Sequence, residues 1–155
     1  MMSNVTDKDL GWKRIVRKMN FVDGKEIKAG VLSSAGTEKN GRPIAQVGAD
    51  NEFGTKASAS RPWDVPSRPF LSKTTDEKKG WQSNVNRCVG NILGGAEVIS
   101  ELNAVGETMK TDIKDIFGQV SKFKKLKPST IKKKGHNLPL LDSMNLYDAI
   151  DFEVK

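Results

Sequence analysis

A long helical pattern in the second half of the chain most constrains its fold. Seven apolar residues recur there at spacings of three and four: Ile99, Leu102, Val105, Met109, Ile113, Ile116 and Val120. This spacing places them on one face of a helix that we expect to run from about Ala96 to Val120. The remaining surface of that helix is mainly acidic. We therefore expect one apolar face in the core and one charged face outside.

A second helical pattern precedes it. Thr74 is followed three residues later by Glu77, which is the pattern of a capping box at a helix N-terminus. Apolar residues then recur at helical spacing at Trp81, Val85, Cys88 and Ile92. Together these features predict a helix that begins near Thr74 and ends near Gly94 and Gly95.

Two segments alternate with the period of two residues that is typical of strands. The first covers residues 26–32 and the second covers residues 148–154. Their alternating apolar residues are Ile27, Ala29 and Val31 in the first, and Ile150, Phe152 and Val154 in the second. Charged residues separate the apolar ones in the second segment, which predicts a half-buried antiparallel strand.

The N-terminal part predicts a short amphipathic helix over residues 7–19, with Thr6 or Asp7 as its N-cap. Its apolar residues at helical spacing are Trp12, Ile15, Val16 and Met19. The predicted fold class is α/β, of the α+β type: a small mixed or antiparallel sheet packed against two long helices and preceded by this amphipathic helix. We expect a single domain, 1–155, with an N-terminal helical arm (1–22) and a body (23–155).

Two short motifs flank a polar loop in the first half of the chain. The first motif consists of Asn51, Glu52, Phe53, Gly54 and Thr55, and the second contains Pro66, Arg68, Pro69, Phe70 and Leu71. We expect Phe53 to be an apolar anchor and Gly54 to end a helical turn in the left-handed conformation. Residues 56–64 are small and polar, so they predict an exposed loop. The two prolines favour extended backbone, after which Phe70 and Leu71 would enter the body just before the next helix.

This pair of motifs resembles a family of small neck proteins of long-tailed bacteriophages, which includes tail-completion, tail-terminator and head–tail joining proteins. Members of that family commonly carry a third motif near the C-terminus. Its fitting residues here are Pro139, Leu140, Asp142 and Leu146. The chain departs from the pattern at Ser143 and Met144, where threonine and glycine are usual. The resemblance covers most of the chain, from Ile27 to Lys155, and favours a helix over a strand for residues 43–53.

The resemblance implies a virion structural protein of the neck or tail, made in the bacterial host cytoplasm. Such proteins form a homo-oligomeric ring, typically six-fold, that caps the tail tube and meets the head connector. DNA passes through the ring without sequence-specific contacts. The hydrophobic fraction of 36% is enough for one core but lean, and chains of this kind often finish burying their apolar surface in an assembly.

The formal net charge of +7 is unevenly distributed. Residues 121–134 hold no acidic residue, and their lysines are Lys122, Lys124, Lys125, Lys127, Lys132, Lys133 and Lys134. This segment could face DNA, an acidic helix of a neighbouring subunit, or water. For a ring contact, the candidate pair is Lys132 to Lys134 against Glu97 and Glu101. The alternative function is a basic nucleic-acid-binding module, although Phe123 and Leu126 alone are too few for a stacking platform.

The sequence contains no recognisable catalytic constellation. His136 is the only histidine, in a loop flanked by lysine and glycine, and Cys88 is the only cysteine, on the apolar stripe of the second helical pattern. We expect a surface imidazole and a buried, inert thiol. The expectation is therefore a protein that is not an enzyme and needs no metal or cofactor. No stretch approaches the length of a membrane span, so no membrane partner is expected.

Overall fold

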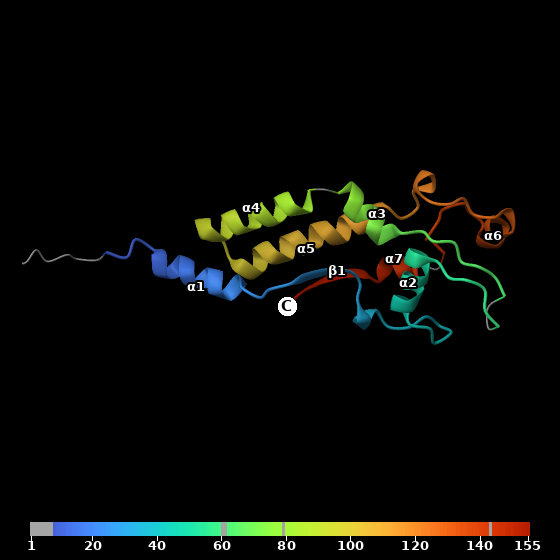
Figure 1. Cartoon of the computed structure of the whole chain (residues 1–155), viewed down its shortest axis with the longest axis horizontal. Helices are drawn as coiled ribbons and strands as arrows, with labels where there is room; N and C mark the ends of the chain where they lie inside the picture. Colours follow the sequence, from blue (N-terminus) through green and yellow to red (C-terminus); the bar gives the residue numbers. More distant parts are fainter. Residues whose placement is uncertain (1–7, 60–61, 79, 143) are drawn as a thin grey trace, which may run out of the picture.

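The computed structural model describes residues 8–59, 62–78, 80–142 and 144–155, and it shows a helix-rich α+β fold (Figure 1). In chain order, the elements are α1 (Trp12–Val22), β1 (Ile27–Val31), η1 (Ser33–Ala35), α2 (Ile44–Phe53), α3 (Phe70–Glu77), α4 (Trp81–Gly94), α5 (Val98–Asp115), η2 (Val120–Lys122), α6 (Pro128–Lys134), α7 (Asn145–Asp148) and β2 (Ile150–Val154). The predicted fold class is confirmed: a small antiparallel sheet packs against long helices, and an N-terminal helix precedes it.

The sheet pairs the strand that follows α1 with the strand at the C-terminal end of the chain. Strands β1 and β2 pair antiparallel, with Ile27 opposite Val154 and Val31 opposite Ile150. Both predicted strands are thereby confirmed. A two-stranded sheet is marginal by itself in water, so it needs a helix packed against one face. Helix α5 provides that layer.

Helix α5 lies between the sheet and α4 (Figure 1). Its approach to β2 depends on Gly106, because a Cβ atom there would lie 2.2 Å from Cδ2 of Phe152. On the other side, one apolar cluster joins α4 to α5 through Cys88, Ile92, Val98, Leu102 and Val105. The apolar stripe that the sequence predicts is therefore divided between two neighbours, the sheet and α4.

A second apolar cluster surrounds the C-terminal end of α5. Phe70 is fully buried there, and its ring lies edge-on to that of Phe117, with 5.1 Å between the ring centroids. Tyr147 packs against the other side of Phe117 at 5.7 Å. Leu146 and Ile150 belong to the same cluster, so it ties α3, α5, α7 and β2 together.

The helix predicted to begin near Thr74 is in fact two helices, α3 and α4. Thr74 is not an N-cap, because it lies inside α3, is 1% exposed, and donates a hydrogen bond from Oγ1 to the carbonyl of Phe70 at 2.7 Å. Phe70 and Leu71 likewise belong to the first turn of α3, not to the segment before it. Helix α3 begins earlier than expected because a carboxylate from α2 caps it, which no local pattern reveals.

Helix α5 is shorter than the predicted range of residues 96–120. Glu97 is its N-cap and accepts a hydrogen bond from the backbone N–H of Ser100 at 2.8 Å. The helix ends at Asp115, and Gly118 turns the chain with a φ of 78°. Val120 lies beyond that turn in η2. The glycine therefore keeps the helix from continuing, although apolar residues recur at helical spacing beyond it.

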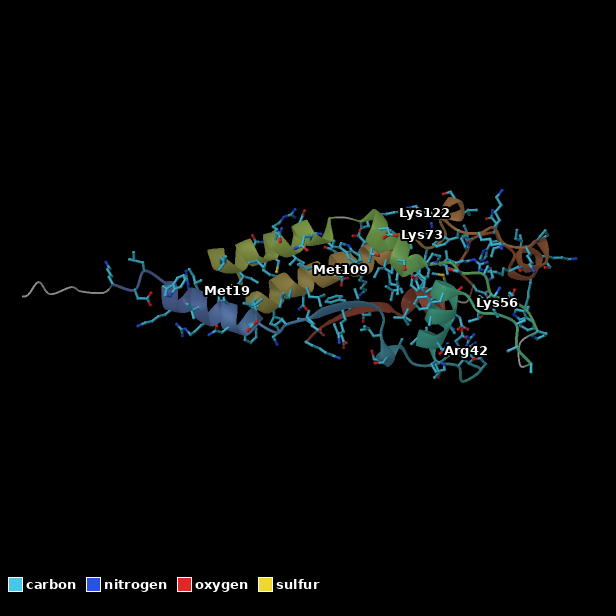
Figure 2. The ribbon with its side chains drawn as sticks, viewed as in Figure 1. Met19, Arg42, Lys56, Lys73, Met109 and Lys122 are labelled. Carbon is cyan, nitrogen blue, oxygen red and sulfur yellow. The ribbon has the colours of Figure 1, made fainter. Side chains whose placement is uncertain are left out.

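The N-terminal helix exists, but its position and its packing differ from the prediction. It runs from Trp12 to Val22, whereas the expected caps, Thr6 and Asp7, lie outside the described residues. None of its 11 residues is buried. Trp12 is 70% exposed and Met19 is 38% exposed, so the predicted apolar face is not part of either core cluster. Figure 2 shows Met19 near one end of the elongated molecule.

Candidate functional site: three joined motifs and a basic groove

Glu52, in the last turn of α2, caps the N-terminus of α3. The residue is 5% exposed, and its carboxylate accepts hydrogen bonds from the backbone N–H groups of Leu71 at 2.8 Å and Ser72 at 2.9 Å. The Ser72 hydroxyl donates to the same carboxylate. The first N–H groups of a helix lack partners inside the helix and form the positive end of its dipole, so a carboxylate is stabilised there. Glu52 of the first motif therefore holds the second motif in place.

Backbone contacts join the same two motifs. The N–H of Arg68 donates to the carbonyl of Asn51 at 2.6 Å, and the Ser67 hydroxyl donates to the carbonyl of Glu52 at 2.7 Å. Thr55 and Val65 exchange two backbone hydrogen bonds, each 2.9 Å long. The loop between the motifs is thus closed at its base, and the two motifs form one structural unit.

Gly54 makes that close approach possible. Its φ of 72° and ψ of 166° lie in a region that essentially only glycine occupies. A Cβ atom at this position would lie 2.8 Å from the backbone nitrogen of Ser67 and 2.9 Å from the carbonyl oxygen of Val65. The predicted helix end at Gly54 is confirmed, but its conformation is extended with positive φ, not left-handed helical.

Phe53 is not the apolar anchor that the sequence suggested. Its side chain is 79% exposed, whereas Asp50 and Glu52 on α2 are buried. Successive residues of a helix point about 100° apart, so turning Glu52 toward α3 turns Phe53 away from the core. Asp50 is held by ion pairing with Arg42 and by a hydrogen bond from Gln46 at 3.0 Å. The need to cap α3 therefore decides which side chain of this turn is buried.

The third motif leads into α7 and β2. Pro139 is fully buried, its carbonyl accepts a hydrogen bond from the N–H of Gly118 at 3.3 Å, and Leu146 is 7% exposed in the core. Leu140 and Met144 have positive φ angles of 65° and 62°. For residues with a side chain this conformation costs about 1–2 kcal/mol. Met144 therefore occupies a conformation that glycine would adopt at lower cost.

Residues of all three motifs line one cleft of about 310 Å³. From the motifs they are Asn51, Pro66, Arg68, Leu140, Asp142 and Leu146. Lys134, at the end of α6, also lines this cleft. The structure therefore brings together residues that are up to 95 positions apart in the sequence.

Among the described residues, charges of both signs line this cleft: Arg68 and Lys134, with Glu38, Asp64 and Asp142. Burial lowers the pKa of Arg68. Burial is also the main cause that lowers the pKa of Lys134, and the charge of Arg68 lowers it further, whereas Asp142 opposes both effects. The Nε atom of Arg68 is buried and has no hydrogen-bond partner among the described residues. The cleft is therefore not a site of excess positive charge.

A larger groove of about 690 Å³ lies next to the cleft and shares Arg68 with it; we call it the basic groove. Its charged lining residues are Lys56, Arg68, Lys124, Lys125 and Lys127, with Asp64 as the acidic one. Two aromatic side chains also line it: Phe53 and Trp63, the latter 61% exposed. Figure 2 shows Lys56 at the end of the molecule opposite to Met19.

Sequence reasoning missed the basic groove for two reasons. Phe53 was assigned to the core, and the Lys124 to Lys127 segment was considered without the loop of residues 56–64. A tryptophan in that otherwise small, polar loop was the available signal, because an aromatic side chain in an exposed loop has no core to fill.

The candidate charged pair for a ring contact is not joined within one chain. Lys132, Lys133 and Lys134 belong to α6, at the opposite end of the molecule from the start of α5 (Figure 1). At that start, Glu97 caps α5, and the carboxylate of Glu101 accepts a hydrogen bond from Nδ2 of Asn91 at 2.9 Å. A contact between the two groups would therefore have to be a contact between subunits.

Neither residue with catalytic potential has a reactive setting. Cys88 is 4% exposed, and burial raises the pKa of its thiol, which confirms the predicted buried thiol. His136 is half-buried, and its Nδ1 accepts a hydrogen bond from the N–H of Leu138 at 3.3 Å. Within residues 8–59, 62–78, 80–142 and 144–155, no three His, Cys, Asp or Glu side chains are grouped so that they could hold a metal ion.

A scan against protein-family models and searches of curated proteins and of solved structures found no match to this chain. Among the helices that the structure describes, none is long and apolar enough to traverse a lipid bilayer.

Proposed function

We propose that the protein is a structural component of the neck or tail of a long-tailed bacteriophage virion. It would assemble into a homo-oligomeric ring that caps the tail tube and meets the head connector, in a tail-terminator or in a tail-completion and head–tail joining role. The sequence resemblance suggests this class. The interlocking of the motifs supports it, since the residues that carry the resemblance pack together as one unit.

One observation carries the proposal of self-assembly: apolar side chains are exposed together at one end of the molecule. We call them the arm surface, and they are Leu10, Trp12, Met19 and Phe21 around α1, Leu93 on α4 and Ile99 on α5, each between 37% and 89% exposed. Helix α1, the end of α4 and the start of α5 lie at this end in Figure 1. Trp12 and Met19 share one face of α1 and Phe21 lies on the opposite face, so a partner that removes these exposed apolar side chains from water would have to cover both faces.

A closed ring with head-to-tail contacts needs two different patches on each subunit. The arm surface is one patch, and Glu97 lies beside it, since Phe21 and Glu97 line the same depression. The region of α6 with Lys132 to Lys134 is the proposed complementary patch at the other end. The four basic residues of α1 outnumber Glu97 and Glu101 at this end. We therefore expect apolar burial to contribute more to assembly than charge pairing does.

The test is the oligomeric state of variants, measured by sedimentation velocity over a range of protein concentrations. Replacing Trp12 and Phe21 together with serine should dissociate the oligomer, because central aromatic residues of an interface contribute about 2 kcal/mol or more each. Val85→Ser, which removes an exposed apolar side chain from α4 outside both proposed patches, is the matched control and should leave the oligomer intact. An oligomer that survives the double substitution would refute the assembly surface proposed here.

The charged part of the contact has a separate test. Replacing Lys132, Lys133 and Lys134 with glutamate should weaken the oligomer at low salt and have less effect at high salt, because screening reduces the contribution of exposed charges. An oligomer that is unchanged at both salt concentrations would remove these lysines from the contact. Locating the protein at the neck or tail end in a virion reconstruction tests the assignment itself.

The alternative function, a basic nucleic-acid-binding module, is favoured by the basic groove. It predicts that the isolated subunit binds nucleic acid with a strong dependence on salt, whether or not it assembles.

A further inference from the structure

We infer that the basic groove is a binding site for a nucleic-acid strand, in which the cations contact phosphates and the two aromatic side chains stack on bases. All the groups involved belong to one subunit. The inference is therefore separate from the proposed ring, and each can fail without the other.

The first argument is the excess of cations. Among the residues that the structure describes, Lys56, Arg68, Lys124, Lys125 and Lys127 line the groove, and Asp64 is the one carboxylate. Asp64 is already engaged, since its Oδ1 accepts a hydrogen bond from the N–H of Ala57 at 2.7 Å. Lys124, Lys125 and Lys127 form no ion pair with any residue that the structure describes. These are the conditions under which phosphates bind and displace counterions.

Lysines elsewhere in the molecule show the contrast. Lys78 pairs with Asp112 at 3.0 Å, and Lys110 pairs with Asp151 at 3.1 Å. In both cases the carboxylate raises the pKa of the lysine. Lysines elsewhere in the chain therefore have carboxylate partners, whereas few carboxylates line the groove.

The second argument is Arg68, which lines the groove from the second motif. Its Nε atom is buried without a hydrogen-bond partner in the described part of the chain. A buried donor on a charged group is unfavourable unless an acceptor reaches it. Guanidinium groups suit phosphate oxygens because their donors form a planar fork. An anion in the groove would supply the missing acceptor.

The third argument distinguishes a nucleic acid from an acidic peptide. Phe53 and Trp63 both line the groove and are 79% and 61% exposed. Base–aromatic stacking is the usual partner of a basic channel in proteins that bind single strands, and it tolerates any sequence. An acidic peptide would neutralise the lysines but would leave both aromatics uncovered. The volume of about 690 Å³ lies in the range of small-ligand sites, which suits a short part of a strand.

The probe is a fluorescein-labelled strand of twelve thymidines, with affinity measured by fluorescence anisotropy on the full chain. Three or four phosphate contacts predict that affinity falls about 20-fold to 50-fold between 50 mM and 200 mM salt. Replacing Lys124, Lys125 and Lys127 with glutamine should remove most of this salt dependence. Trp63→Ala should weaken binding about tenfold at every salt concentration, because stacking is not screened.

The matched control removes the same number of charges outside the groove, by replacing Lys28, Lys39 and Lys155 with glutamine. This variant should keep the affinity of the unchanged protein, and circular dichroism should show that all variants fold. Absence of binding, or equal losses in the groove variant and the control, would overturn the inference. Equal competition by polyglutamate, together with no effect of Trp63→Ala, would also overturn it, because the groove would then accept acidic peptides.

The ring and the groove can be separated in one further experiment. The Trp12→Ser, Phe21→Ser double variant should be monomeric and should still bind the strand through its groove. Loss of strand binding in this variant, with the fold intact, would show that the site needs more than one subunit and would contradict the inference.

Discussion

The motif end and the arm end of the molecule bury their side chains in different ways. At the motif end, formed by α2, α3, α7 and the cleft between them, key contacts are made within the chain: Glu52 caps α3, and Gly54 lets two backbone segments meet. At the arm end, α1 has no buried residue, and Trp12 and Phe21 are 70% and 49% exposed.

This difference distinguishes the part of the fold that a single subunit stabilises from the apolar surface that a partner would cover. The motif end should be stable in a single subunit, because Glu52 caps α3 and the apolar cluster around Phe70 is buried there. The arm end offers apolar surface that gains free energy only when it is removed from water. Substitutions at the motif end should therefore change folding, and substitutions at the arm end should change assembly.

The largest expected effect on folding is that of Gly54→Ala. The substitution combines a conformation that is unfavourable for alanine with a methyl group only 2.8 Å from the nitrogen of Ser67. We expect a loss of about 4 kcal/mol in the free energy of unfolding, measured by urea denaturation. Gly36→Ala is the control, because Gly36 has a similar φ of 77° but nothing within 4 Å of its Cβ position. It should lose only about 1–2 kcal/mol, and equal losses would refute the role of close packing.

The next largest effect is that of Glu52→Gln. An amide keeps the shape but replaces one of the two acceptor oxygens with a donor, so one N–H group at the start of α3 loses its partner. We expect a loss of about 2 kcal/mol, again by urea denaturation. Glu26→Gln removes a carboxylate whose side chain is 64% exposed and pairs with Lys28 at 3.1 Å, and it should change stability by less than about 0.5 kcal/mol. A Glu52 variant as stable as this control would show that the cap does not matter.

A smaller effect on folding is expected at the arm end. Replacing Trp12 and Phe21 with serine should change the unfolding free energy of the monomer by less than about 1 kcal/mol, because neither residue is buried in the subunit. Denaturation at a concentration low enough to dissociate the oligomer is the measurement. A loss as large as that of Glu52→Gln would mean that the arm end is part of the core, and the comparison would fail.

The smallest expected change in stability is a gain, whereas the substitutions above reduce stability. Met144→Gly should stabilise the protein by about 0.5 kcal/mol, because the gain from relieving a φ of 62° exceeds the entropy that glycine adds to the unfolded chain. Ala104→Gly, at an exposed position inside α5, should instead destabilise by about 1 kcal/mol. Thermal unfolding compares the two, and destabilisation by both would show that the turn at Met144 is not strained.

The sequence predicted those parts of the fold that local patterns determine. The alternation in residues 26–32 and 148–154 placed both strands, and Gly54 placed the end of α2. The start of α3 and the exposure of Phe53 were mispredicted because both depend on Glu52, a residue of another element. The end of α5 was mispredicted because apolar spacing continues beyond Gly118.

The candidate site was predicted only in part, for a related reason. The motif residues were identified from their order in the chain, but their meeting in one cleft required the fold. The basic groove combines the loop of residues 56–64 with the segment around Lys124 to Lys127, which is about 60 positions away. Neither segment indicates by itself that the other lies opposite to it.

The most direct test of the account is the mass of the purified protein in solution, measured by native mass spectrometry and by sedimentation equilibrium at increasing concentration. The account predicts one closed oligomer of the 17.1 kDa chain, typically of six copies, with its assembly dependent on Trp12 and Phe21. A protein that remains a 17.1 kDa monomer at every concentration, with its arm surface exposed to water, would contradict the central claim.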